Sequence, residues 1–221
     1  DSGPQGGVGF FVSLLVLSFV LRLTLLGIWA IIPSVPKEKF LAIAICALSG
    51  FFLAPFIIKG AWSVTLHEWK HSFISSLVGN KAKKFVVEGE EGHFQYEYTQ
   101  KTKGYNAFIA LAPYVVVIFV WFAIFLPYVF KVPAPEGILH VMLVSFIYGI
   151  DLQCNTKDIS PIQTDISNIR GGYLIGLIYI VLMNLVVGAF LLAWTLGGVE
   201  GLMLVFKQMY WFLRELFFGS I

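Results

Sequence analysis

The sequence predicts an all-α polytopic membrane protein with about five to six transmembrane helices and one small surface β-hairpin. Of its 221 residues, 58% are apolar and 13% are charged, whereas soluble domains usually carry about 25% charged residues. The mean hydropathy is +0.82, and several apolar runs approach the roughly 20 residues that a helix needs to cross a bilayer. This composition argues against a nucleic-acid-binding protein and against an outer-membrane barrel.

The chain is expected to form a single membrane-embedded domain, residues 1–221. Residues 8–32 form the first expected span, which two prolines end because proline continues a helix poorly. Arg22 interrupts this span, and a charge there is expected to form a structural ion pair, to snorkel or to serve a functional site. Residues 40–79 are apolar again and are expected to be one span or a broken helix.

Residues 80–104 are rich in Lys and Glu and form the only sizeable polar segment. In them Phe94, Tyr96 and Tyr98 alternate with polar residues after a glycine-bounded turn, a pattern typical of a β-hairpin. Residues 105–130 are then expected to form a span with kinks at its prolines. The sequence therefore predicts a surface hairpin between two membrane segments.

The C-terminal half is expected to contain two more spans. Residues 138–170 form a span that ends in a polar break bearing aspartates, and such breaks usually line a site or cavity. Residues 171–198 form a long apolar span, and residues 199–221 read as an amphipathic helix in the membrane interface or as a sixth span.

The distribution of Lys and Arg predicts the orientation. Seven of them fall on the side of the expected hairpin: Lys81, Lys83, Lys84, Lys101, Lys103, Lys157 and Arg170. By the positive-inside rule this side faces the cytoplasm. The expected location is a prokaryotic-type plasma membrane, crossed several times.

The segment His67-Glu68-Trp69-Lys70-His71 matches H-E-x-x-H. On a helix this spacing puts both imidazoles on one face, where they can bind one Zn²⁺. Glu68, one position around, can act as a general base toward water. The motif therefore predicts a catalytic Glu68 and the metal ligands His67 and His71.

A hydrolytic zinc site needs a third protein ligand and an open fourth position. The polar break near the end of the 138–170 segment is on the same side as the motif and offers Asp151, Asp158 and Asp165. His93 in the hairpin is a further candidate, whereas His140 lies toward the opposite side and is expected to be structural. The residues alone leave this choice open.

The order of these features resembles the site-2 protease class of intramembrane zinc metalloproteases, as a small, minimal member. The resemblance covers about residues 67–165 and rests on the membrane H-E-x-x-H, the short strands after it, and the stretch Pro161-Ile162-Gln163-Thr164-Asp165. It implies Asp165 as the third ligand of one zinc ion per chain, with Asp158 as a rival. The residue after Asp165 is Ile166, where the family has glycine.

The resemblance implies hydrolysis of peptide bonds in a membrane-anchored protein or peptide near the cytoplasmic face. Asn106 and Asn155 are expected either to contact substrate or the oxyanion, or to cap helix ends. The hairpin could hold an extended substrate by strand addition or simply pack on the lipid surface. The alternative class is a non-enzymatic metal transporter or assembly scaffold that binds a cation through the same cluster. Partners are the lipid bilayer and the substrate, with no nucleic acid, and self-association is left open.

Overall fold

The computed structural model describes residues 7–89, 91–131 and 137–219 and is mostly helical, with one two-stranded antiparallel sheet. Within this part of the chain, four helices are long and apolar enough to cross a membrane. They are α1 (Val8–Ile31), α2 (Lys37–Ile57), α6 (Ile138–Thr156) and α8 (Gly172–Phe218). A bent pair of helices brings the number to five at most, compared with the five to six expected from the sequence.

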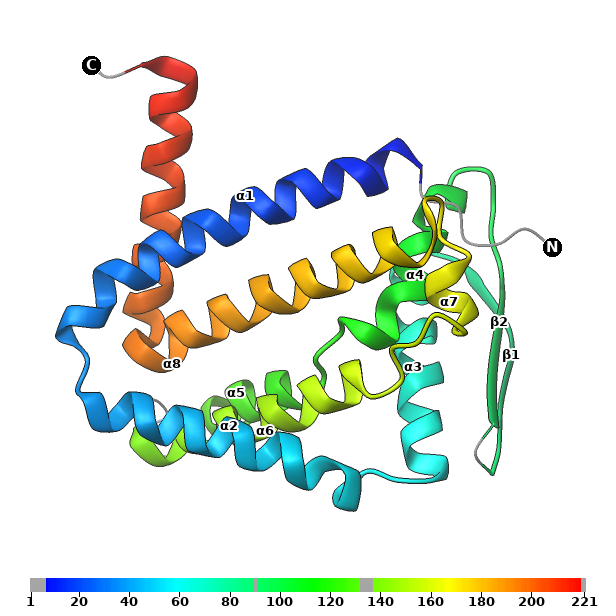
Figure 1. Ribbon diagram of the computed structural model, residues 1–221, viewed down its shortest axis with the longest axis horizontal. Coiled ribbons are helices and arrows are strands. Elements are labelled where there is room, and N and C mark those ends of the chain that lie inside the picture. Colours follow the sequence, from blue (N-terminus) through cyan, green and yellow to red (C-terminus); the bar gives the residue numbers. More distant parts are fainter. Residues whose placement is uncertain (1–6, 90, 132–136, 220–221) are drawn as a thin grey trace.

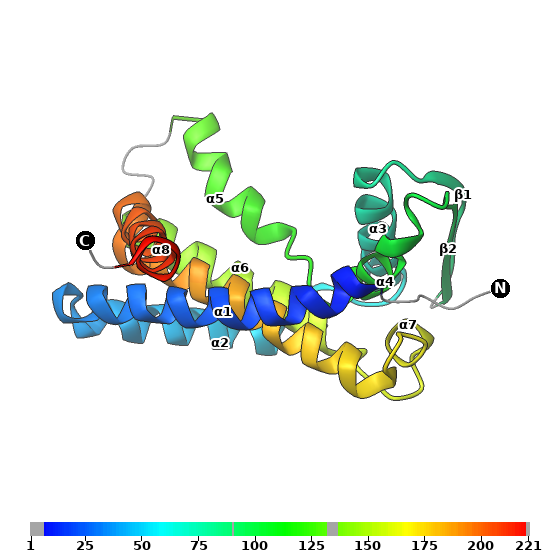
Figure 2. The ribbon, with the colours of Figure 1, turned by 90° about the horizontal axis from the view of Figure 1, so that it is seen from above.

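The four long helices lie alongside one another in a layer (Figures 1 and 2), in which α2 packs along α6 and α1 packs along α8. Glycines allow the close approach of α2 and α6. A Cβ atom on Gly50 would overlap the carbonyl group of Phe146, and one on Gly149 would overlap the carbonyl oxygen of Ala47. Small residues at such crossings let helix backbones meet directly.

The apolar region 40–79 contains two helices rather than one. Helix α2 ends at Ile57, and Gly60 turns the chain with φ +56°, a conformation that favours glycine. Helix α3 (Ala61–Leu77) then runs across the ends of the layer helices (Figure 1) and is not among the four candidate spans. The H-E-x-x-H motif therefore lies on a transverse helix.

A hairpin follows α3, with strands β1 (Lys81–Glu88) and β2 (Glu91–Glu97). Phe85 faces Phe94, Glu88 faces Glu91, and Gly89 has φ +65°. Glu90, in the expected turn, lies outside the described residues. The hairpin packs against α3 at one end of the molecule (Figure 1).

The expected span over 105–130 is broken. Helix α4 (Asn106–Leu111) continues into a 3-10 turn (Ala112–Tyr114), and after a non-helical stretch α5 (Phe119–Val129) leaves at 79°. Asp151 of α6 accepts hydrogen bonds from the backbone N–H groups of Ile118 and Val120, at 3.2 and 2.8 Å. This carboxylate satisfies donors that the start of a helix leaves unpaired.

The segment expected to be a span and a break over 138–170 is α6 followed by a loop and the short helix α7 (Thr164–Ser167), which carries Asp165. Helix α8 bends at Gly198, where φ is +61°. The Nζ of Lys39 donates to the carbonyl oxygen of Leu196 at 2.9 Å, beside this bend. The last part of α8 forms an arm that leaves the layer (Figure 1), and it begins at the residue where the expected amphipathic helix begins.

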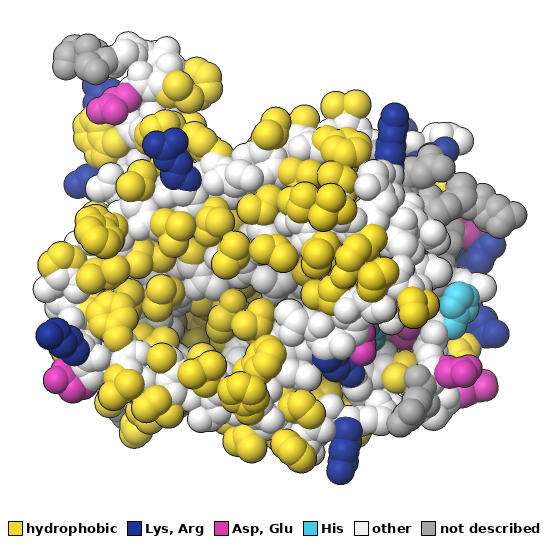
Figure 3. Space-filling view, in the orientation of Figure 1, with side chains coloured by type: hydrophobic (Ala, Val, Ile, Leu, Met, Phe, Trp, Pro, Cys, Tyr) yellow, Lys and Arg dark blue, Asp and Glu magenta, His cyan; other side chains and the backbone are white. Residues whose placement is uncertain are grey.

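Apolar side chains cover the middle of the face seen in Figure 3, over the long helices, and charged side chains lie mostly toward its ends and on the arm. Exposed apolar residues occur along all four long helices, including Leu15, Phe52, Leu139 and Leu185. A belt of this kind is what hydrocarbon would cover. Membrane insertion is therefore plausible for this chain.

Candidate metal centre

Helices α3 and α7 bring three potential ligands together at the end of the molecule that carries the hairpin. The Oδ2 atom of Asp165 lies 3.4 Å from Nε2 of His67 and 3.3 Å from Nε2 of His71. One ligand atom from each residue lies within 4.8 Å of the other two. The histidines come from neighbouring turns of α3, whereas Asp165 arrives from almost a hundred residues later in the chain.

These separations fit a metal site. Zn²⁺ binds histidine nitrogen and carboxylate oxygen at about 2.0–2.2 Å in a tetrahedron, so two ligand atoms are about 3.3 Å apart. Both contacts of Asp165 have this length. Two imidazoles and one carboxylate are also a donor set found in hydrolytic zinc sites, with the fourth position open. The cluster could therefore hold a metal ion.

Hydrogen bonding prepares His71 for this role. Its Nδ1 lies 2.8 Å from the carbonyl oxygen of Ile109 in α4. A carbonyl only accepts, so Nδ1 carries a proton, and Nε2 is the nitrogen left to bind a metal ion once it is deprotonated. Nothing in the sequence pattern indicated this contact, because it depends on how α4 packs beside α3.

The carboxyl of Asp165 is held in its charged form. Burial acts to raise its pKa, but hydrogen bonds and charge from His67 and His71 outweigh burial and hold the pKa well below its usual range. A carboxylate must be deprotonated to bind a metal ion. Asp165 meets this condition at neutral pH.

Glu68 lies beside the cluster at the wall of a cavity of about 990 Å³. It is 9% exposed, and β2 passes directly over it at Gly92. A Cβ atom on Gly92 would come within 3.0 Å of Oε1 of Glu68 and would overlap Val64. The glycine therefore lets the strand approach the carboxylate that the motif assigns as general base.

Polar groups from the hairpin and α4 line the same cavity, among them His93, Tyr96 and Asn106. Burial raises the pKa of Tyr96 to about 12, so its hydroxyl remains a donor at neutral pH. Asn106 is 5% exposed, and its Oδ1 has no hydrogen-bond partner among the described residues. A buried amide of this kind is suited to a polar ligand.

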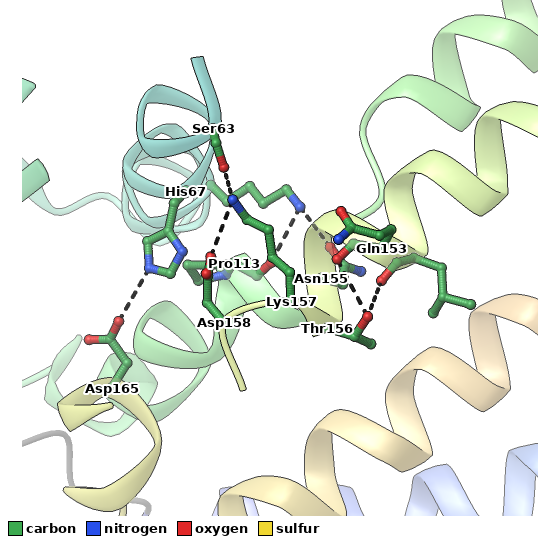
Figure 4. A network of polar contacts seen from close by, with 11 residues as sticks. Ser63, His67, Pro113, Gln153, Asn155, Thr156, Lys157, Asp158 and Asp165 are labelled. Carbon is green, nitrogen blue, oxygen red and sulfur yellow. Dashed lines mark hydrogen bonds and ion pairs between the residues drawn. The ribbon is translucent and has the colours of Figure 1, made fainter. Parts of the chain in front are cut away.

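Asp158, the rival third ligand, also lines the cavity but lies outside the three-residue cluster. Its carboxylate is 3.6 Å from Nζ of Lys157, and that amine also bonds to Ser63 of α3 (Figure 4). His67 and Asp165 face each other in the same view. Asp158 thus takes part in an ion pair at the cavity wall.

Asn155 is fully buried and does not line the cavity. Its Oδ1 accepts from Nζ of Lys70 at 2.6 Å, and its Nδ2 donates to Asn184 at 3.1 Å. Lys70 also donates to the carbonyl oxygen of Pro113 at 3.3 Å. The expectation that Asn155 contacts a substrate or the oxyanion does not fit this position, because its amide joins α3, α6 and α8 in the core.

The remaining candidates also have other roles. Asp151 caps α5, as described above, and is completely buried. His140 bonds through Nε2 to the carbonyl oxygen of Ala123 at 2.7 Å and packs its ring on Trp194. Asn184, which bonds to the backbone at Tyr114, was not singled out from the sequence, although a lone amide in an apolar run is itself a signal.

Comparison of this chain with protein-family models, with curated proteins and with solved structures gives no match. The site must therefore be interpreted from its own geometry.

Proposed function

We propose that this protein is a membrane-embedded zinc metalloprotease that hydrolyses peptide bonds of membrane-anchored substrates near the cytoplasmic face. The observation that supports this proposal is the convergence of His67, His71 and Asp165 on one point beside Glu68, at the wall of a large polar cavity. A binding protein would need the three ligands alone. An acidic group beside them but outside the ligand cluster is what hydrolysis requires.

In this proposal His67, His71 and Asp165 hold one zinc ion. When bound, zinc polarises a carbonyl group and lowers the pKa of water. Glu68 accepts the proton of the attacking water and later gives it to the leaving nitrogen. Asn106 and Tyr96 offer an acceptor and a donor in the cavity, where they can orient the peptide.

The substrate must be extended where it is cut, because a helix hides its peptide bonds. Residues 92–96 of β2 line the cavity, and the two-stranded sheet leaves one edge of β2 without a strand neighbour among the described residues. A peptide added along this edge would gain backbone hydrogen bonds and pass over Glu68. Strand addition is therefore the binding mode that we propose.

The orientation follows from the basic residues. The hairpin and the end of α6 lie at the same end of the molecule (Figure 1), so the basic residues of the 80–104 segment gather beside the metal centre. By the positive-inside rule this concentration of basic residues supports a cytoplasmic location for this end.

The test is zinc content and cleavage measured on the same samples in lipid nanodiscs. The probe is a mixture of single-span peptides with polar juxtamembrane segments, and mass spectrometry identifies the products. Glu68→Gln should keep its zinc and lose cleavage, because the amide cannot accept the proton. Cleavage that persists in this variant would reject the proposed base.

Asp165→Asn and Asp158→Asn form a matched pair for the third ligand. Zinc at about 100 times its Kd should stabilise the wild type by about 2.7 kcal/mol. We expect this gain to disappear in Asp165→Asn and to remain in Asp158→Asn. The reverse result would move the ligand to Asp158. A wild type that binds zinc but cleaves no peptide in the mixture would favour a cation-binding scaffold or transporter.

A further inference from the structure

Helix α3 has a second face that the metal centre does not use. Trp62, Trp69, Phe73 and Leu77 recur at spacings of seven and four, so they lie on one side of the helix. We call these four residues the aromatic stripe. Trp62 is 73% exposed and Trp69 41% exposed, and the rings of Trp69 and Phe73 stack with centroids 5.2 Å apart. None of the four lines the metal cavity.

The other sides of α3 are covered. The hairpin packs on α3 at Val64 and Glu68, and α4 contacts it through His71. Lys70 extends toward α6. The aromatic stripe is therefore the side of α3 that the described part of the molecule leaves open.

The position of α3 indicates what covers the stripe. The apolar helix α2 ends at Ile57, and Lys59 and Gly60 follow before α3 turns across the ends of the long helices (Figure 1). A lysine at this point is typical of the level at which hydrocarbon ends. Trp is enriched at the same level, because its ring is apolar and its N–H is polar.

The end of α2 that leads into α3 is also apolar and exposed. Phe52 and Phe56 near the end of α2 are 67% and 75% exposed, one helical turn apart, and Trp62 follows them across the turn at Gly60. If lipid covers α2 to its end at Ile57, α3 begins at the edge of that lipid. A helix with one apolar aromatic face and one polar face is suited to lie in the membrane interface.

We propose that α3 lies flat in the interface of the bilayer, with the aromatic stripe in the headgroup and acyl boundary and the metal centre on the opposite, aqueous side. A helix is about 10 Å wide with its side chains, so the zinc ligands stand about one helix diameter above the stripe. Where the proposed protease activity also holds, the bond that is cut lies in the juxtamembrane segment of the substrate rather than inside the hydrocarbon.

The test measures the depth of the stripe by tryptophan fluorescence in phosphatidylcholine nanodiscs. The lipids carry bromine, a quencher, either near the carbonyl end or near the methyl end of the acyl chains. The signal of Trp62 is the difference between the wild type and Trp62→Phe, and that of Trp69 comes from Trp69→Phe. Trp194, which is buried at 4% exposure, gives the control through Trp194→Phe.

We expect bromine near the carbonyl end to quench Trp62 and Trp69 more strongly than bromine near the methyl end, and iodide in the water to quench them weakly. Trp194 should be protected from every quencher. Strong quenching by iodide with none by brominated lipid would overturn the proposal, because the stripe would then face water. Protection from both quenchers would also overturn it, because a protein partner would then cover the stripe. Fluorescence reports depth without zinc or substrate, so its outcome is independent of the proposed protease activity.

Discussion

The close crossing of α2 and α6 predicts that a single methyl group destabilises the fold. In Gly149→Ala the new Cβ would overlap the carbonyl oxygen of Ala47 and approach the backbone nitrogen of Phe51 to 2.8 Å. Backbone atoms cannot turn aside as a side chain can, so the two helices must move apart. Overpacking of this kind typically costs about 1–3 kcal/mol.

An intrinsic effect acts in the opposite direction. Replacing glycine by alanine inside a helix gains about 0.5–1 kcal/mol from backbone entropy. The net change for Gly149→Ala is therefore a destabilisation of up to about 2.5 kcal/mol. Gly197 is the matched control, because a Cβ there would meet only the side chain of Ile31, at the ordinary contact distance of 3.7 Å. Gly197→Ala should stabilise the protein or leave it unchanged.

The assay is thermal unfolding of the purified protein in one detergent, followed by tryptophan fluorescence. The unfolding midpoint of Gly149→Ala should fall, whereas that of Gly197→Ala should rise or stay unchanged. Gly50→Ala should resemble Gly149→Ala, and the double variant should lose less than the two changes add up to, because helices already forced apart accept the second methyl group more easily. An unchanged or raised midpoint for Gly149→Ala would show that the crossing is looser than described.

Three other predictions concern the site and its support. Gly92→Ala should abolish cleavage while zinc content stays constant, because the new methyl group pushes β2 away from Glu68. Gly104→Ala is the control, because a methyl group there meets nothing within 4 Å, and it should be as active as the wild type. Unchanged cleavage in Gly92→Ala, or an equal loss in both variants, would contradict the proposed approach of β2 to Glu68. Asp151→Asn should lower the free energy of unfolding by about 1–3 kcal/mol, because an amide NH₂ would face a backbone N–H at the start of α5. A denaturant midpoint equal to that of the wild type would argue against a stabilising role for the hydrogen bonds of Asp151 to this helix end. Lys70→Met keeps the apolar length of the side chain but leaves the buried acceptors of Asn155 and Pro113 without a donor. We therefore expect the free energy of chemical unfolding to fall by about 1–3 kcal/mol. A higher free energy of unfolding would show that burying the amine costs more than its hydrogen bonds contribute.

Local patterns predicted much of the fold. The alternation of aromatic residues predicted the hairpin, and the start of the amphipathic arm at residue 199 was predicted next to Gly198, where α8 bends. Hydropathy also identified the four long apolar helices. These features depend on neighbours in the chain, so the sequence contains their signal.

For features that depend on distant contacts, the prolines and the length of the apolar runs predicted kinks or breaks, but not the directions that the helices take after them. The transverse direction of α3 depends on the backbone conformation of Gly60 and on the hairpin and α4 that pack against it. The 79° break before α5 depends on a carboxylate from α6. Among the described residues four helices, or five with the bent pair, qualify as spans, at the lower end of the expected five to six, because hydropathy measures apolar length and not direction.

In the candidate site, too, the residues that are close in the sequence were predicted from their spacing, and the contacts between distant segments were not. The spacing of His67 and His71 is local and predicts a shared helix face, while Asp165 was reached only through the resemblance to a family, since the residues alone left several aspartates open. The network of Lys70, Asn155 and Asn184 was missed, because its members come from three helices and each reads singly as a polar residue in an apolar segment.

The break between α4 and α5 and the carboxylate of Asp151 stabilise each other. Were residues 112–119 to straighten into one continuous helix, the amides of Ile118 and Val120 would return to backbone carbonyls, and Asp151 would be left as a buried anion without its donors. Straightening would therefore lose both hydrogen bonds and leave the carboxylate buried or force it to take up a proton. We therefore expect the break between α4 and α5 to keep its shape, and motion during a functional cycle to occur elsewhere in the chain.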